Sequence, residues 1–260
     1  MTHHDTRPIP AYLQEAMGQD WSRVYDQLDD EDVTPVVDRL ARLAGDSRAL
    51  ELGVGTGRIA LPLAQRGVTV DGLDASGPML AALSAKDPQG SVTQIEGDMA
   101  APLSRPRAYG LIYVINNTLS HLLSQSRQMD CILNAAAALS PGGHFVIEGN
   151  LPAVEQADQV GEKLLYMDAG EVRLRYAKVD PASQVIRYQI ARMTGGRVTL
   201  FPMSLRYIWP SELDLMAAIA NLQLVDRFGD WDGTPFEGAA RRHVSIYRKR
   251  PGGQENEQGI

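Results

Sequence analysis

The feature that most constrains the fold of this chain is a regular alternation, from about residue 48 onward, of short apolar runs with helical patterns. The apolar runs predict strands at residues 49–52, 68–73, 92–95, 111–115 and 144–147. The segments between them predict helices at residues 58–65, 78–85 and 126–139. Continuous apolar strands separated by helices are typical of a parallel sheet that is covered on both faces. Because strand–helix–strand connections are right-handed, the sequence predicts a doubly wound α/β sheet.

The alternation stops after Leu151. Residues 155–170 favour mixed helix and loop, and strand-like runs follow at residues 172–179, 184–193 and 198–208. Turn residues separate these runs, so they predict an antiparallel meander. A helix over residues 211–221, with Ser211 as its cap, is expected next. Two more strands, at residues 223–228 and 243–247, are expected to close the main sheet.

Three glycines follow the first predicted strand in the run ALELGVGTGR. Gly53, Gly55 and Gly57 allow positive φ angles and a close approach of the backbone to a ligand, and the helix beyond them presents unpaired N–H groups. Several nucleotide-binding families share such a turn, so the glycines alone do not identify the ligand. Glu51, two residues before the first glycine, would repel a pyrophosphate but can receive an ammonium group. This acid favours S-adenosylmethionine (SAM), which carries an ammonium and a sulfonium and no phosphate.

Further acids lie where the second and third predicted strands end. Asp74 can accept both hydroxyls of a ribose, a role that fits NAD and SAM equally, or it can cap the following helix. Asp98 can accept the exocyclic amine of adenine, while the Met99 backbone N–H can meet a ring nitrogen and Met79 can pack on the adenine face. Asp71 is interpreted as a strand-edge or solvated residue. Carboxyl ends of successive parallel strands meet at the ligand-binding edge, so these acids predict an adenosyl site there.

With these residues the chain resembles the class I SAM-dependent methyltransferases. The resemblance runs from about Val33 to Leu151 and includes the glycine-rich run, the Gly97-Asp98 pair and the Pro-Gly-Gly turn before the fifth strand. It implies a Rossmann-like seven-stranded methyltransferase sheet with helices on both faces and an antiparallel insertion forming a lid. The cofactor is then SAM, the product is S-adenosylhomocysteine, and the expected cofactor-binding residues are Glu51, Gly53, Gly55, Gly57, Asp74, Ala75, Met79, Asp98, Met99 and Asn116.

A second resemblance concerns the segment NNTLSHL after the fourth strand, which is similar to a stretch in bacterial small-molecule N-methyltransferases, including those acting on amino sugars. It implies that His121 assists the acceptor and that Tyr25 lies near the cofactor, and both are candidate catalytic residues. Histidine titrates near neutral pH and can act as a general base; the alternative is a histidine bonded to backbone without chemistry. The expected substrate contacts are Asn117, Glu148, Tyr207 and Trp231. The sequence departs from the amino-sugar enzymes over residues 155–210, which leaves the acceptor undefined.

The resemblance also gives a domain organisation. The expected parts are an N-terminal arm or helix over the active site (1–32), the SAM-binding core (33–151), an antiparallel substrate or lid insertion (152–209), the final helix and closing strands of the core (210–250) and a disordered tail (251–260).

Composition and charge limit the kinds of partner that this chain is expected to bind. The net charge of −7 disfavours nucleic acid, because phosphate binding requires a clustered positive surface. We expect no membrane partner and a cytoplasmic protein, since no apolar run approaches the ~20 residues of a membrane span, the first residues lack a signal-peptide pattern and Cys131 is the single cysteine. No metal is expected, because no ligand-spaced cluster appears. A homodimer is left open.

These inferences predict an enzyme of secondary metabolism that transfers the methyl group of SAM to an N or O atom of a small metabolite by in-line displacement. Two alternatives use similar sheets: an NAD-dependent oxidoreductase of a small alcohol or sugar, and a SAM-binding protein without catalysis.

Overall fold

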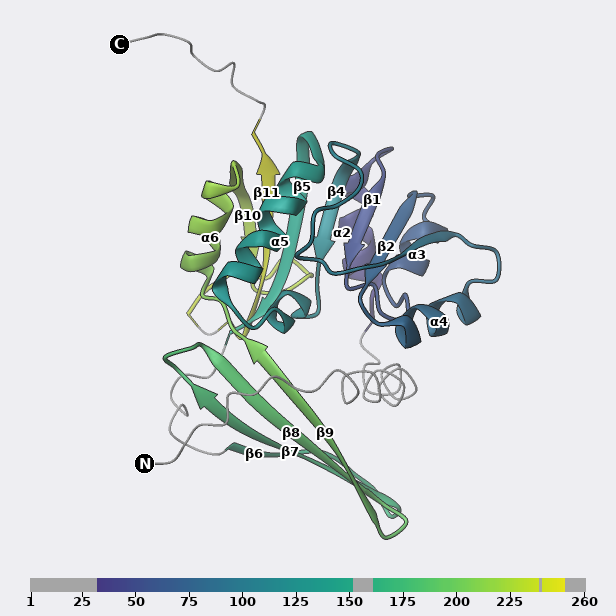
Figure 1. The fold of residues 1–260 in the computed structure, drawn as a ribbon, viewed down its shortest axis with the longest axis vertical. Coiled ribbons are helices and arrows are strands. Elements are labelled where there is room, and N and C mark those ends of the chain that lie inside the picture. Colours follow the sequence, from purple (N-terminus) through teal and green to yellow (C-terminus); the bar gives the residue numbers. More distant parts are fainter. Residues whose placement is uncertain (1–31, 152–160, 239, 251–260) are drawn as a thin grey trace.

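A computed structural model of the chain describes residues 32–151, 161–238 and 240–250. Its main sheet has seven strands in the order β10-β11-β5-β4-β1-β2-β3 (Figure 1). Only β11 runs antiparallel to its neighbours, and the other pairings among β1 to β5 are parallel. The strands are β1 (Ala49–Leu52), β2 (Val70–Asp74), β3 (Val92–Glu96), β4 (Tyr109–Val114), β5 (Leu139–Asn150), β10 (Leu222–Phe228) and β11 (Arg242–Lys249). The predicted doubly wound α/β sheet is therefore confirmed.

Helices pack on both faces of this sheet, each over its own apolar core (Figure 1). Leu40, Leu63 and Leu83 bury one face against Val146, and on the other face Ile132 and Leu213 lie in the same cluster as Phe145 and Ile147. Such burial of leucine, isoleucine and phenylalanine contributes about 1.5–3 kcal/mol per side chain. The helices are α2 (Thr34–Ala44), α3 (Ala60–Gln65), α4 (Gly77–Lys86), α5 (Gln125–Ala138) and α6 (Pro210–Ile219), with a 3-10 turn, η1 (Thr118–His121), after β4.

A second, four-stranded antiparallel sheet is inserted between β5 and α6 and extends away from the main sheet (Figure 1). Its strands, in spatial order, are β6 (Gly161–Met167), β7 (Glu171–Asp180), β8 (Val185–Thr194) and β9 (Arg197–Arg206). The three predicted strands of the meander are confirmed, but the interpretation of residues 155–170 as helix and loop is wrong for β6. A register shift between Leu164 and Tyr166 interrupts the period-two pattern by which a strand is recognised in sequence.

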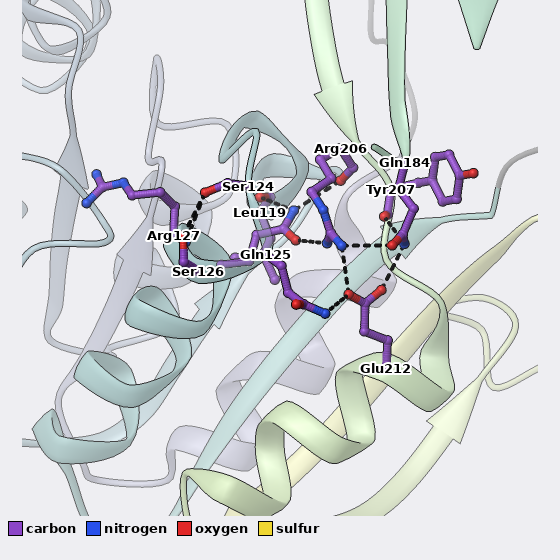
Figure 2. Close-up of polar contacts among 10 residues, drawn as sticks. Leu119, Ser124, Gln125, Ser126, Arg127, Gln184, Arg206, Tyr207 and Glu212 are labelled. Atoms are coloured by element: carbon purple, nitrogen blue, oxygen red, sulfur yellow. Dashed lines mark hydrogen bonds and ion pairs between the residues drawn. The ribbon is translucent and has the colours of Figure 1, made fainter. Parts of the chain in front are cut away.

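One buried arginine joins the second sheet to the main domain (Figure 2). Arg206, at the end of β9, is 4% exposed and forms an ion pair with Glu212 of α6 at 2.8 Å. It also donates hydrogen bonds to the side chains of Gln128 in α5 and Gln184 before β8. Gln128 in turn donates to the carbonyl oxygen of Leu119 in η1. The network therefore links β9, α5, α6 and η1.

Three local predictions are wrong. Ser211 does not cap α6: Trp209 is the N-cap residue without a side-chain bond, and Pro210 occupies the first turn, where its missing N–H costs little. Asp71 is fully buried rather than solvated, because Arg48 and the Tyr109 hydroxyl both donate to its carboxylate. β5 extends to Asn150, so Glu148 lies within the strand. The N-terminal arm over residues 1–31 and the tail over 251–260 lie outside the described residues.

Candidate active site

The glycine loop follows β1 and is held by backbone bonds to the neighbouring strand. The N–H groups of Gly53 and Val54 both donate to the carbonyl oxygen of Leu73, at 2.7 and 2.9 Å. Gly53 has φ +77°, and a Cβ on it would lie 2.3 Å from Cγ2 of Thr118. Gly57 has φ +83°, a conformation that L side chains rarely adopt. The loop therefore requires glycine both for its backbone angles and for its contact with η1.

Asp74 orders the loop from the end of β2. One carboxylate oxygen accepts the Gly55 N–H at 2.8 Å and the other accepts the Ser76 N–H at 2.8 Å. Ser76, not Asp74, caps α4, since its hydroxyl accepts the Met79 N–H at 3.4 Å. Asp74 is only partly buried and Ala75 beside it is exposed, so free lone pairs of the carboxylate remain available to ribose hydroxyls.

Glu51 is a buried carboxylic acid in β1. It is 4% exposed and accepts a hydrogen bond from the Tyr113 hydroxyl of β4 at 3.1 Å. Burial raises its pKa from 4.5 to about 8, against the opposing effects of this hydrogen bond and of the Arg58 charge. The sequence analysis missed Tyr113, although parallel pairing of β1 with β4 sets it opposite Glu51 and the register could have revealed it.

Asp98 follows β3 at the same edge of the sheet. One oxygen accepts the Ala100 N–H at 2.9 Å and the other forms an ion pair with Arg127 of α5. Its side chain is 47% exposed, and Met99 next to it is partly buried against the core. Asp98 therefore keeps its carboxylate at the surface of the site, in contact with a cation from the chain itself.

Two asparagines shape the turn after β4, and both adopt positive φ angles, 53° for Asn116 and 58° for Asn117. The Asn116 N–H donates to Glu148 at 2.9 Å. The Asn117 side-chain oxygen accepts from the Ser120 hydroxyl at 2.9 Å and from the Asn150 N–H at 3.0 Å. Asn117 and Glu148 are therefore both bonded to the chain at the acceptor edge where they were predicted to meet substrate.

His121 ends η1 and its side chain is exposed. The surrounding protein lowers its pKa from 6.5, while the carboxylate of Asp74 acts in the opposite direction. Thr118 of the same turn lies against Gly53, so η1 and His121 lie beside the glycine loop.

Two of the remaining predicted residues are buried, and the third lies outside the described residues. Tyr207 is buried where the two sheets join, with its ring against Trp209 at a centroid distance of 5.7 Å. Trp231 is 5% exposed in the core cluster of α2 and α3, so it packs the main domain and does not form an acceptor wall. Tyr25 lies outside the described residues. Within the described ranges no group of three His, Cys, Asp or Glu side chains could hold a metal ion.

Comparison with known proteins decides the family. The family described as "Methyltransferase domain" matches residues 49–143. The CcbJ methyltransferase of Streptomyces caelestis is 37% identical to this chain, and the superposition covers 90% of this chain and 98% of CcbJ with a TM-score of 0.83. The cypemycin N-terminal methyltransferase of a Streptomyces species is 26% identical over 203 residues, which make up 77% of this chain and 82% of that protein.

The chain belongs to the SAM-dependent methyltransferases.

A SAM-bound structure shares the fold at lower identity. CalS10, an amino pentose methyltransferase from Micromonospora echinaspora, is 20% identical to this methyltransferase and superimposes over 95% of this chain and 100% of CalS10 with a TM-score of 0.63. The family membership supports SAM over NAD and an enzyme over a binding protein without catalysis. No helix in the described part of the methyltransferase is long and apolar enough to cross a membrane.

The residues at the carboxyl edge fit SAM. SAM has a cationic amino-acid end and a ribose. The buried Glu51 suits the cationic end, and the partly buried Asp74 suits the ribose. The glycine loop has no side chain that would keep the ligand away from the backbone. When bound, SAM supplies an electrophilic methyl group on a sulfonium that is already a good leaving group. The protein's contribution to such a reaction is alignment of the reactants, exclusion of water and removal of a proton.

Proposed function

We propose that this methyltransferase transfers the SAM methyl group to an amine nitrogen of a small metabolite, with His121 as the base that removes the amine proton. Glu51, Asp74, Asp98 and the glycine loop hold the cofactor in this proposal. The observation that carries it is the contact of η1 with the glycine loop: Cγ2 of Thr118 lies where a Cβ on Gly53 would be, and His121 ends the same short turn.

The chemistry follows from a neutral imidazole beside the cofactor edge. The amine lone pair attacks the methyl carbon, the new N–C bond forms as the C–S bond breaks, and the sulfur takes the electron pair. The methylated nitrogen is then an ammonium, and His121 accepts one of its protons. One relative supports a nitrogen acceptor, since its name specifies N-terminal methylation.

The test uses the full-length protein with methyl-deuterated SAM and a panel of small primary and secondary amines, each paired with the alcohol of the same skeleton. Mass spectrometry detects the labelled product. We expect methylated amines, and we expect His121→Ala to reduce turnover with SAM affinity retained. His144→Ala is the matched control and should behave as wild type, because His144 pairs with Leu111 near the start of β4, away from the carboxyl ends of the strands. Labelled ethers without labelled amines, or full turnover by His121→Ala, would contradict the proposal.

The second sheet is proposed to cover the acceptor side as a lid. β9 contacts η1, the turn that presents His121, and Arg206 fixes this end of the sheet to the main domain. A lid at this position would exclude water from the methyl group. Glu148 and Tyr207 remain predicted acceptor contacts on the main domain beside it.

We also propose that two copies associate through one face of the second sheet. The strand register sets five apolar side chains on the same face: Leu164, Met167, Tyr176, Val198 and Leu200. Each is at least 36% exposed, and Met167 reaches 67%. Contiguous apolar patches of this kind mark interaction surfaces. Light scattering after size exclusion should show a dimer that Leu200→Glu dissociates and Leu215→Glu, a change on exposed α6, leaves intact. A monomeric wild-type protein would refute this proposal.

The absence of a nucleic-acid partner and the cytoplasmic setting stay predictions.

A further inference from the structure

A small pocket lies on the α6 face of the main sheet, behind η1. Its polar walls come from Asn117 and Ser120, which bracket the first part of η1, from Glu148 and Asn150 in β5, and from His243 in β11. Apolar walls come from Ile147 of β5 and Leu213 of α6. A cavity with several polar groups among apolar walls is the kind of site that holds an ordered water molecule. Asn117 and Glu148 in its wall are also predicted acceptor contacts, but the proposed function gives no role to the space behind η1 itself.

His243 is the most buried of the polar groups that line this pocket, with 2% of its surface exposed. Its Nδ1 lies 2.9 Å from the Ser245 hydroxyl. Among the described residues this is the only hydrogen bond of the ring. The Nε2 atom is on the other side of the ring, against Gly149, another wall of the pocket: a Cβ on Gly149 would lie 2.7 Å from Nε2.

The partners of Ser245 determine which ring nitrogen carries the proton. Arg227 Nε lies 2.8 Å from the Ser245 oxygen and can only donate to it. The hydroxyl hydrogen of Ser245 is then available to His243 Nδ1, which accepts it. The proton of the neutral ring is therefore on Nε2, facing the pocket. Arg227 is itself fixed by Asp214 of α6 at 2.5 Å, so this orientation is determined from two elements.

The ring is neutral at working pH. Burial lowers the pKa of His243 from 6.5 to about 4, with the Arg227 charge acting in the same direction and Asp214 opposing it. His243 is thus a fixed donor and does not act as a base. Nε2–H has no hydrogen-bond acceptor among the described residues, so an oxygen atom in the pocket can accept its hydrogen bond.

η1 lies between this pocket and the cofactor loop. On one side Thr118 occupies the space that a side chain on Gly53 would need. On the other side Ser120 donates to Asn117, and both residues line the pocket. His121 is the next residue after Ser120. A shift of η1 into the pocket would therefore move His121 relative to the glycine loop.

We propose that the pocket holds one ordered water molecule that accepts a hydrogen bond from Nε2–H of His243, and that His243 thereby positions η1 and His121 for methyl transfer. The water fills the space behind η1 and connects it to the rigid β5–β11 pair. His243 is a positioning residue in this scheme, since it acts through η1 and does not touch SAM. The statement about His121 rests on the proposed function, whereas the water and the ring tautomer do not.

The first test measures the pocket itself. A crystal structure of the full-length protein should show a water within hydrogen-bond distance of His243 Nε2. Nitrogen-15 NMR of histidine side chains should show the Nε2–H tautomer for His243, unchanged between about pH 6 and about pH 8. A dry pocket, or a proton on Nδ1, would overturn the proposal. These readouts remain valid if no amine is ever methylated, so failure of the proposed function is distinguishable.

The second test compares variants. His243→Phe keeps a ring but removes the donor, and we expect kcat for the best amine of the panel to fall by about 10- to 100-fold, the range that misplacement by about 1 Å produces. The Kd for SAM and the Tm should stay near wild type, and the NMR signals of His121 should shift. His243→Gln supplies an amide N–H close to the place of Nε2 and should restore most of kcat. His144→Phe, in the same strand pair, is the control.

If His243→Phe does not fold, Gly149→Ala provides the same test, because its Cβ displaces the ring near Nε2. Wild-type kcat in His243→Phe or in Gly149→Ala, or an equal loss in His243→Gln, would show that the donor does not position η1.

Discussion

Replacing Glu51 by glutamine is expected to stabilise the SAM-free protein near neutral pH while weakening its affinity for SAM. Burial raises the pKa of Glu51 from 4.5 to about 8, so the folded chain retains a proton that the unfolded chain releases between these values. The free energy of unfolding therefore falls as the pH rises through this window, and it is constant with respect to this group above and below it. Between pH 4.5 and pH 7 the free energy of unfolding falls by about 1.4 kcal/mol per pH unit, which gives a loss of about 3 kcal/mol at pH 7.

Glutamine has no titrating proton, yet its side-chain oxygen can still accept the hydrogen bond from Tyr113. The penalty then disappears, and Tm in the absence of SAM is expected to rise by about 6 to 12 °C at pH 7. SAM acts in the opposite direction, because its ammonium interacts best with an ionised carboxylate. Below a pH of about 8, SAM must displace the Glu51 proton, so wild-type affinity rises with pH in this range. The variant loses this slope and about 1.5–3 kcal/mol of binding free energy, or about 10- to 100-fold in Kd.

Two assays measure these effects. Thermal unfolding between about pH 5 and about pH 9 gives the stability without SAM. Calorimetric titration with SAM in buffers of different ionisation enthalpy gives Kd and the number of protons released. Glu162→Gln is the matched control. Glu162, like Glu51, accepts a hydrogen bond from a tyrosine hydroxyl, that of Tyr176 at 3.4 Å, but Glu162 is exposed. A Glu51→Gln protein with wild-type Tm at pH 7, or with wild-type affinity and proton release, would refute the reasoning.

Three further changes test other contacts. Gly53→Ala should abolish measurable SAM binding in calorimetry, because its Cβ would meet Cγ2 of Thr118 at 2.3 Å and the backbone has φ +77°. Asp74→Asn should weaken SAM binding by about 10- to 100-fold, since an amide nitrogen cannot accept the N–H bonds that order the loop; unchanged Kd would exclude this role. Arg206→Met should lower the free energy of unfolding in urea by about 3–5 kcal/mol by leaving Glu212 without its buried partner, and a loss below about 1 kcal/mol would contradict the network.

The main sheet could be predicted from the sequence because its signals are local. Short strands alternate with helices along the chain, and Gly53, Gly55 and Gly57 mark the turn where β1 ends. β6 could not be predicted, because its register shift interrupts the alternation of buried and exposed side chains and because it is defined by its pairing with β7. Asp71 was misread for the same reason: its partners Arg48 and Tyr109 are 23 and 38 residues away in sequence.

The candidate site shows the same division. The glycine loop and the acids at the strand ends were predictable because parallel strands bring their carboxyl ends to one edge. Tyr113 and His243 were not, because each depends on a residue of another strand: Tyr113 bonds to Glu51 of β1, and the bond of His243 to Ser245 is oriented by Arg227 of β10. Trp231 was predicted to line the acceptor site because of its residue type, but in the structure its side chain packs in the hydrophobic core. Residue type predicts what a side chain can do, and the strand register decides which face it is on.

The three acids of the cofactor edge differ in burial, and this difference assigns them different tasks. Glu51 is 4% exposed, Asp74 is partly buried, and the Asp98 side chain is 47% exposed. A buried carboxylate interacts strongly with a cation and is little affected by salt, whereas an exposed one is screened within about 10 Å at 0.1 M salt. Glu51 therefore suits the ammonium end of the cofactor. Asp98, which already pairs with Arg127, suits a neutral hydrogen-bond donor such as the adenine amine, where direction matters more than charge.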